Sequence, residues 1–500
     1  MTEDLAAVRR RKMEALRAAG VAVWPDRFPK SHDSAAARAL FERLEPALGA
    51  AGAETSETVS VAGRVVLFRP MGKLVFGQVQ DARGRIQFAL KKDVLGAERF
   101  KLLLDHLDLG DFLGVTGPLF RTRTGEVTVR AAEAVFLGKA LRPLPEKWHG
   151  LQDREACYRQ RHLDLVGNPD TMARFRLRSA FVRETRRHLE EHGFEEVDTP
   201  VLVTKPSGAL ARPFATHHNS LDLDVYLRIA PETYLKRLVV GGYERVYEFA
   251  RCFRNEGMDP SHLQDFTMLE WYAAYWNFED NMRYTESLLR EGLGRLFGTG
   301  PIEVRGRKVD LSKEWPRVRM LDLVEERTGL RVREHPEPAD LRRAIAAKGI
   351  VLEDAAKMGW GSLVDALYRK ACRPHLDGPV FLVGHPIELS PLARRNDADP
   401  TIADRYQLVV AGWEIVNAYS ELVDPIDQRE RLAAQARARA GGDEEAMEMD
   451  EDYLAAMEHG MPPISGFGMG IDRVVALFSG AENLRDVVFF PLVRPLDAPG

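Results

Sequence analysis

Hydrophobic and polar residues alternate in short runs between residues 59 and 137, the pattern expected of half-buried β-strands. Gly72, Gly84 and Gly125 separate some of these runs, and a helical stretch at 98–106 lies between the third run and the fourth. The pattern therefore predicts five strands, with the sequences VSVAGRVVLF, LVFGQVQD, RIQFALKK, FLGVTGPLF and EVTVRAAEAVFL.

The order of these elements indicates the fold of the segment. Five strands with a helix between the third and the fourth describe an OB-fold barrel, which binds single-stranded nucleic acid by stacking bases on aromatic side chains above a cationic groove. Residues 57–140 hold 13 Lys and Arg against 9 Asp and Glu, a balance of +4, whereas the whole chain carries −5. This local basic excess suits a nucleic-acid partner without requiring one.

The segments around the barrel predict its boundaries. Residues 1–20 indicate an amphipathic helix, with Arg9 to Lys12 facing water and a loose apolar stripe formed by Leu5, Val8, Met13 and Leu16. Small and polar residues at 46–57 indicate a linker. Three prolines mark the stretch after the barrel. We expect an N-terminal extension and linker, a barrel domain, a hinge and a second domain at 1–56, 57–140, 141–170 and 171–500.

Beyond residue 170, helix and strand patterns do not alternate as they do in a doubly wound parallel sheet. A long helix is expected at 174–191, where Leu177, Phe181, Thr185 and Leu189 recur every four residues. Residues 427–459 read as charged helix with a solvated acidic run. Further helices are expected at 231–240, 278–297, 320–328 and 471–479, and strands at 223–229, 246–253, 266–272, 379–383, 406–412 and 416–423.

Composition narrows the class of protein. The chain has 500 residues, of which 45% are hydrophobic and 29% charged, as in globular proteins of two or three domains. No apolar run is long enough to span a membrane, and the charged N-terminus lacks the core of a signal peptide, so a cytoplasmic location is expected. The isolated Cys157, Cys252 and Cys372 predict buried free thiols and no zinc site.

The stretch 251–272, RCFRNEGMDPSHLQDFTMLEWY, carries the candidate chemistry. It predicts a strand–loop–strand hairpin with Arg251 and Arg254 three residues apart. A guanidinium group presents a planar fork of donors that matches a carboxylate or a phosphate. On this stretch alone, a surface hairpin with ordinary ion pairs is an equally good interpretation.

Two further stretches favour a binding site. Residues 466–473, GFGMGIDR, place closely spaced glycines before an apolar helix, so the backbone can approach a flat ligand and Arg473 can reach a phosphate. Residues 194–200, FEEVDTP, end a strand in proline. In this order the three stretches resemble the signature motifs of class II aminoacyl-tRNA synthetases. The flanking words ARPFATHHN, LDVYLRIAPETYLKRLVVGG and ALRPLPEKWHGLQDREACYRQRHLDL resemble lysyl-tRNA synthetases of the bacterial type, and the likeness spans residues 55–496.

The resemblance implies an α+β fold, with the OB-fold barrel followed by an antiparallel sheet flanked by helices. It implies a homodimer that joins its subunits through residues 174–200, although burial of that helix within one chain is the alternative. The implied reaction is ATP-dependent ligation of L-lysine to tRNA(Lys) through a lysyl-adenylate, with Mg²⁺ and release of AMP and pyrophosphate.

The resemblance also assigns roles to single residues. Arg254 and Arg473 would be catalytic, bridging the amino-acid carboxylate and the α-phosphate and holding the γ-phosphate. ATP would be bound by Arg254, Glu256, His262, Phe266 and Arg473. Lysine would be bound by Gly208, Glu232, Arg254, Glu270, Tyr272, Asn417, Tyr419, Glu421 and Gly468. Metal ligands would be Glu414, Glu421 and Gln407. The anticodon would be read by Arg69, Phe76, Gln87 and Glu126.

Three positions depart from the family pattern. Gln407 stands where a second magnesium glutamate is usual, Trp413 where an arginine is common, and Asp265 where the second motif has a glutamate. A neutral amide can coordinate magnesium but adds no charge. Two alternatives therefore stay open: a class II paralogue that lysylates a protein, and a catalytically impaired homologue that only binds RNA.

Overall fold

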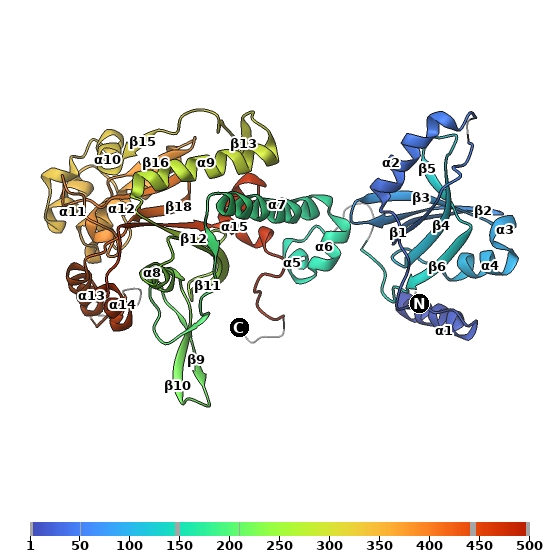
Figure 1. Ribbon diagram of the computed structural model, residues 1–500, viewed down its shortest axis with the longest axis horizontal. Helices are drawn as coiled ribbons and strands as arrows, with labels where there is room; N and C mark the ends of the chain where they lie inside the picture. The colour runs from blue at the N-terminus through green and yellow to red at the C-terminus, as the bar shows by residue number, and fades with distance from the viewer. Residues whose placement is uncertain (1–3, 51, 146–150, 210, 441–446, 497–500) are drawn as a thin grey trace. The chain divides into compact units, whose positions relative to one another are not determined.

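The computed structural model describes residues 4–50, 52–145, 151–209, 211–440 and 447–496, except for the side chain at 438. The chain forms two compact units, residues 1–151 and 152–500. Figure 1 shows a small β-rich unit, coloured blue to cyan, and a larger unit with one broad sheet.

The first unit contains the expected barrel. Its strands pair in the order β1-β2-β3-β5-β4-β6, and pairing of β1 with β4 closes the sheet. Helices α3 (Lys92–Leu95) and α4 (Ala97–His106) lie between the third strand and the fourth, as predicted. The strands are β1 (Thr58–Met71), β2 (Leu74–Asp81), β3 (Gly84–Lys91), β4 (Phe112–Arg121), β5 (Val127–Arg130) and β6 (Glu133–Gly138).

The prediction of a single last strand was wrong. Residues 126–137 form two strands, β5 and β6, which the chain separates at Ala131 and Ala132. The amide of Ala131 donates to the Ala89 carbonyl and that of Ala132 to the Thr116 carbonyl. The break lets β5 pair with both β3 and β4, while β6 pairs with the first half of β4. The barrel therefore closes around a bend that alternation of residue types does not reveal.

Helices α1 (Leu5–Ala18) and α2 (Ser34–Leu44) belong to the same unit. The prediction that Arg9 faces water was wrong. Arg9 is buried on the same side of α1 as Met13 and Leu16, and Leu5 is exposed instead. The Arg9 guanidinium donates hydrogen bonds of 2.9–3.2 Å to the carbonyl oxygens of Leu109, Ala140 and Arg142. A cation is tolerated here because backbone carbonyls replace its water.

A buried cation also anchors the end of the barrel. Nζ of Lys139 lies 2.6 Å from Asp108 and 2.7 Å from Asp111, and it donates to the carbonyl of His106. The side chains of Lys139 and Asp111 are fully buried. Removal of one partner from such a cluster leaves an uncompensated charge away from water.

We expect Lys139→Met to lower the free energy of unfolding of the barrel by about 3–5 kcal/mol, because two carboxylates lose their shared cation. Urea-dependent hydrogen exchange of barrel amides in the full chain measures the change. Lys101→Met is the matched control, since Lys101 pairs with Asp105 on the surface and should change stability by less than about 1 kcal/mol. Equal effects of the two variants would contradict the prediction.

In the second unit, the described residues form one broad sheet in the order β15-β16-β17-β18-β19-β12-β11-β7. Neighbours are antiparallel except at the β15–β16 and β11–β7 pairs, so the predicted antiparallel sheet is confirmed. Its strands are β7 (Glu195–Glu196), β11 (Arg245–Phe253), β12 (Asp265–Ala274), β15 (Arg317–Arg319), β16 (Val380–Val383), β17 (Arg405–Val410), β18 (Trp413–Ser420) and β19 (Ile464–Gly470).

Helices flank this sheet (Figure 1). Helix α9 (Phe278–Phe297) begins at a capping box formed by Asn277 and Asp280. The other principal helices are α8 (Glu232–Val240), α10 (Met320–Thr328), α11 (Pro338–Ala347), α12 (Trp360–Ala371), α13 (Pro425–Ala440), α14 (Glu451–Glu458) and α15 (Ile471–Phe478). Short strands β8 (Leu202–Val203), β9 (Phe214–His218) and β10 (Leu223–Leu227) form a separate sheet, and β13 (Ile302–Val304) pairs with β14 (Arg307–Val309).

Helix α7 (Pro169–Glu191) begins five residues before the expected start, because Pro169 occupies its first turn, where proline needs no hydrogen bond. Phe181 and Leu189 of the predicted stripe pack in one core cluster with Tyr284 and Leu288 of α9. Three of the four stripe residues, Phe181, Thr185 and Leu189, are therefore buried within the chain, as the alternative interpretation of this helix expected.

The described parts of the predicted hinge and acidic run contain two short helices and a buried carboxylate. Helices α5 (Arg154–Arg159) and α6 (Arg161–Gly167) lie in the second unit, and residues 146–150 fall outside the described residues. In the run Asp443–Asp452, residues 443–446 also fall outside them. Asp450 contradicts the solvated interpretation, since it is buried, caps α14 and accepts from Arg237.

Cys252 and Cys372 are buried as predicted, and burial raises the pKa of the Cys252 thiol to about 12. Cys157 is only half-buried, so the prediction fails there. Among the described residues, no helix is both long and apolar enough to cross a membrane.

Candidate active site

A cavity of about 350 Å³ opens over β12, β18 and β19. These strands lie side by side in register: Tyr272, Gly466 and Tyr419 form one row, and Glu270, Gly468 and Asn417 form the next. Gly468 leaves the middle strand bare between Glu270 and Asn417, whereas the side chains of Tyr272 and Glu421 fill the space beside Gly466. A Cβ on Gly468 would meet other atoms only at 3.7 Å or more, so the space above it is free for a ligand.

Arginine side chains line one part of the cavity. Arg254 follows β11 and packs its guanidinium 5.0 Å from the ring centre of Phe266. Its Nε is buried and has no hydrogen-bond partner among the described residues. Glu256 and His262 also line this part. The 2.7 Å contact of His262 Nδ1 with Asp259 Oδ2 orients the imidazole, and the hydrogen bonds that Asp259 accepts lower its pKa to about 2.

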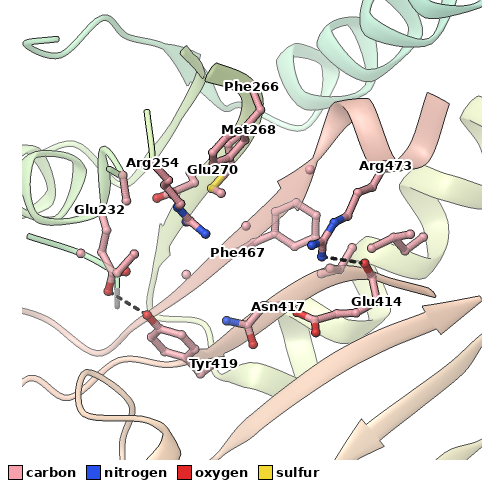
Figure 2. Close-up of a pocket in the computed structure, with 18 of the residues that line it drawn as sticks. Glu232, Arg254, Phe266, Met268, Glu270, Glu414, Asn417, Tyr419, Phe467 and Arg473 are labelled. Carbon is pink, nitrogen blue, oxygen red and sulfur yellow. Dashed lines mark hydrogen bonds between the residues drawn. The ribbon is translucent and has the colours of Figure 1, made fainter. Parts of the chain in front are cut away.

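Arg473 lies in the first turn of α15 and reaches back over the sheet. Its guanidinium donates a 3.4 Å hydrogen bond to the backbone carbonyl of Glu414 (Figure 2). In the same figure Arg254 points into the space between Glu270 and Asn417. Two cationic groups from distant parts of the sequence therefore face one cavity.

Arg251 is positioned differently from Arg254, although both belong to the same hairpin. It pairs with Asp265 at 2.8 Å, donates to the hydroxyl of Thr267 and remains exposed. Among the described residues it is absent from the lining of this cavity. The surface interpretation of the hairpin thus holds for Arg251 and fails for Arg254.

Carboxylates and tyrosines line the other part of the cavity. The hydroxyl of Tyr419 donates to Glu232 at 2.8 Å, and that of Tyr272 to Glu270 at 3.3 Å. Burial and the nearby Glu232 charge raise the pKa of Glu270 well above its usual value. Gly208 closes this end with φ of 89°, and a Cβ there would lie 2.9 Å from the Glu232 Cβ.

Glu421 lies behind the carboxylates and tyrosines that line this part of the cavity. Its carboxylate is buried and contacts Nζ of Lys236 from α8, and it is not among the described residues that line the cavity. A Cβ on Gly466 would stand 2.1 Å from Glu421 Oε1, so only glycine lets β19 pass here. Burial raises the pKa of Glu421 to about 8, and Lys236 opposes the rise.

The chain was compared with known proteins. A model of class II tRNA synthetases of the D, K and N type matches residues 153–494, and a model of OB-fold nucleic-acid-binding domains matches residues 59–137. The lysine–tRNA ligase of Pelotomaculum thermopropionicum is 44% identical over 98% of this chain and 95% of its own length. Its counterpart from Carboxydothermus hydrogenoformans is 44% identical over 99% of both chains. The counterpart from Aquifex aeolicus is 46% identical over 87% of this chain and 73% of its own.

The chain belongs to the class II lysine–tRNA ligase family. The resemblance to lysyl-tRNA synthetases and the two-part α+β fold, both expected from the sequence, are thereby confirmed. Members of this family use ATP as a substrate, generally with Mg²⁺.

The oxygen ligands expected for magnesium in this class II synthetase lie together only in part. Glu414 and Gln407 line a neighbouring cavity of about 510 Å³, together with Arg473 and His385. Glu421 lies with Lys236 instead of on this cavity. Within the described ranges no group of three or more His, Cys, Asp or Glu side chains forms a metal site. One carboxylate and one amide oxygen still suit Mg²⁺, which takes few protein ligands when phosphates supply the rest.

Three residues of the ligase site are not predicted from the sequence. Lys236 lies in a largely apolar helix. Its spacing of four residues from Glu232 was the one signal in the sequence that indicated an ion pair. Arg405 donates to Oδ1 of Asn417 and to the Ser390 hydroxyl, which fixes the Asn417 amide. Asp472 accepts from the Thr267 amide and from Arg178, and so fastens α15 to β12 and α7. The last two pairings join distant segments, which no local pattern reveals.

The barrel presents a separate candidate surface. Phe76 is half-buried, between Val75 and Gly77, which face the core. Arg69 pairs with Phe76 across β1 and β2, so both side chains share the outer face of the sheet. Gln87 lies in β3 and donates to Thr128 of β5 at 2.8 Å. Glu126, two residues before Thr128, is exposed. All four predicted residues are therefore exposed or half-buried, and Arg69 and Phe76 lie side by side.

Proposed function

We propose that the protein ligates L-lysine to tRNA(Lys) in two steps, through a lysyl-adenylate. The observation that carries the proposal is the polarity of one cavity, which has guanidinium groups at one part and buried carboxylates with tyrosines at the other. A molecule with a carboxylate at one end and ammonium groups elsewhere matches this arrangement. The names of the relatives, lysine–tRNA ligase, support the same substrate.

In the first step a carboxylate oxygen of lysine attacks the α-phosphorus of ATP, and the bond to pyrophosphate breaks. Such a transfer needs alignment and charge neutralisation more than covalent help. Arg254 would hold the lysine carboxylate against the α-phosphate, and Arg473 would bind the γ-phosphate. Phe266 would stack on adenine, with Glu256 and His262 contacting the adenine and the phosphates.

Lysine itself would be held along the carboxylate part of the cavity. Glu232 and the backbone of Gly208 would bind the α-amino group. Glu421 with Tyr272 would bind the ε-ammonium, with Glu270 close by. Gly468, Asn417 and Tyr419 would line the slot. An ammonium taken from water without such partners costs several kcal/mol, so the arrangement would exclude uncharged side chains of the same length.

Magnesium would be held by Glu414, with Gln407 offering an amide oxygen. When bound, the ion supplies positive charge to the phosphates. Residues 174–200 would form the homodimer interface, but the inward packing of the α7 stripe leaves that role to other faces of the segment. Sedimentation of the full chain tests the dimer. As a ligase of tRNA, the protein would work in the cytoplasm.

The proposed function predicts lysine-dependent exchange of labelled pyrophosphate into ATP. The test presents all twenty amino acids separately, across a magnesium titration, and then measures charging of tRNA. Exchange with lysine alone, followed by charging, is the expected result. Exchange without charging would favour a paralogue that lysylates a protein. Absence of exchange in folded protein would favour an impaired RNA-binding homologue. The barrel argues against the first alternative, since it offers a surface for RNA.

We expect Phe76→Ala to lower kcat/KM for tRNA charging by about 5- to 150-fold, because one stacked base is worth about 1–3 kcal/mol. Pyrophosphate exchange should not change, since the barrel takes no part in adenylate formation. Met71→Ala is the control, as Met71 is an exposed apolar residue on the same hairpin. Equal loss of exchange and charging would mean that Phe76 is a structural residue.

A further inference from the structure

A buried ammonium sits among the carboxylates of the proposed lysine site. Nζ of Lys236 lies 2.5 Å from Glu232 Oε1 and also contacts the carboxylate of Glu421. The Lys236 side chain has no exposed surface. Lys236 stands one helical turn after Glu232 on α8, so both side chains project from the same face of the helix. The helix therefore delivers a carboxylate and its counter-ion together.

Aromatic rings complete the enclosure. Nζ of Lys236 lies 5.8 Å from the ring centres of three tyrosines, which come from β12, β18 and α14: Tyr272, Tyr419 and Tyr453. Ring faces attract cations, and the attraction grows when water is excluded. The fit of one ammonium to two carboxylates and three rings shows that this compartment is built for a cation. In the free protein Lys236 is that cation.

The same ammonium touches both ends of the proposed lysine site. Glu232 is proposed for the α-amino group and Glu421 for the ε-ammonium, and Lys236 contacts both carboxylates. Two buried carboxylates this close together would otherwise repel each other with no cation between them. We propose that Lys236 is a positioning residue for lysine specificity, whose ammonium holds the carboxylates of Glu232 and Glu421 in place at the two ends of the substrate. This inference rests on the proposed function.

Charged and polar groups from four elements surround Glu421. Helix α8 contributes Glu232 and Lys236, β12 contributes Glu270 and Tyr272, β18 contributes Tyr419, and α14 contributes Tyr453. The only cation in this set is Lys236, whose pKa the two carboxylates raise well above its usual value. Removal of Lys236 would therefore leave the carboxylates of this set without an ammonium among them.

Lys236→Met removes the internal cation, so the two carboxylates are no longer held at a fixed spacing. The KM for lysine should therefore rise by at least about tenfold, because one partner of a buried ion pair is lost. The KM for ATP and kcat should change by less than about twofold, since the phosphate-binding part of the cavity is unaltered.

The experiment measures pyrophosphate exchange with lysine and ATP varied in turn and, independently, lysine binding by calorimetry. Lys236→Arg keeps the charge and should recover part of the loss in KM for lysine. Arg237→Met is the control: Arg237 is the next residue on α8 and pairs with Asp450, away from the two carboxylates. A KM for lysine in Lys236→Met equal to the wild-type value would overturn this inference while the proposed function stands. Absence of lysine-dependent exchange in the wild type would overturn the proposed function itself.

A charge-balanced double variant covers the case in which Lys236→Met does not fold. Glu421→Gln leaves Glu232 beside Lys236. In the double variant Lys236→Met/Glu421→Gln, which has the same net charge as wild type, Glu232 loses its cation. The double variant should therefore have a higher KM for lysine than Glu421→Gln has. Equal KM values for lysine in the single and double variants would overturn the inference.

Discussion

Replacement of Arg254 by methionine is expected to lower the rate of lysine-dependent pyrophosphate exchange by about 10³-fold. Loss of a preorganised group that stabilises the charge of a transition state has an effect of this size in other enzymes. Its guanidinium lies in the cavity beside Phe266, and its buried Nε has no partner among the described residues. The group is therefore held ready for an incoming anion. Arg254→Lys should recover only part of the loss, because an ammonium cannot bridge two oxygens as a fork does.

The same hairpin supplies the control. Arg251 stands three residues earlier, but it pairs with Asp265 and Thr267 on the surface. Arg251→Met should keep exchange within about twofold and change stability by less than about 1 kcal/mol. The Arg254 assignment fails if both variants lose exchange equally, or if Arg254→Met exchanges at the wild-type rate in protein with an unchanged melting temperature.

The sequence predicts the elements of this protein well where the pattern is local. Strands β11 and β12, helix α9 and helix α15 lie within a residue or two of their expected limits, because alternation and helical periodicity reflect which face of each element is buried. The division of the last barrel strand at Ala131 could not be predicted, since it follows from how β5 and β6 pair with β4.

The candidate site, too, is predictable only where the pattern is local. Short motifs bring Arg254, Glu270, Gly468 and Arg473 to one cavity, as expected. Charge on a helix is harder to interpret: the pattern predicts that Arg9 faces water and predicts no role for Lys236, yet both are buried against oxygen atoms from distant segments. The partners of a buried cation come from tertiary packing, and a single sequence without its fold gives no sign of them.

The remaining prediction concerns Glu421, whose carboxylate is buried beside Lys236. Glu421→Gln is expected to raise KM for lysine by about 10²- to 10³-fold, since removal of one partner from a buried ion pair costs about 3–5 kcal/mol. The KM for ATP should stay the same, because the phosphate-binding arginines lie at another part of the cavity. Exchange kinetics with each substrate varied in turn measure both constants.

The control for Glu421→Gln is a second buried carboxylate in the same unit. Glu248 of β11 pairs with Arg228 at 2.6 Å, with both side chains 4% exposed, and it is absent from the described lining of the cavity. Glu248→Gln should lower the melting temperature and leave KM for lysine unchanged. Glu421→Gln should instead raise the KM for lysine and change the melting temperature less than Glu248→Gln does, because Lys236 keeps Glu232 as a partner. If the two variants lose stability alike and neither changes KM for lysine, then Glu421 is a structural counter-ion of Lys236 and lies outside the substrate site.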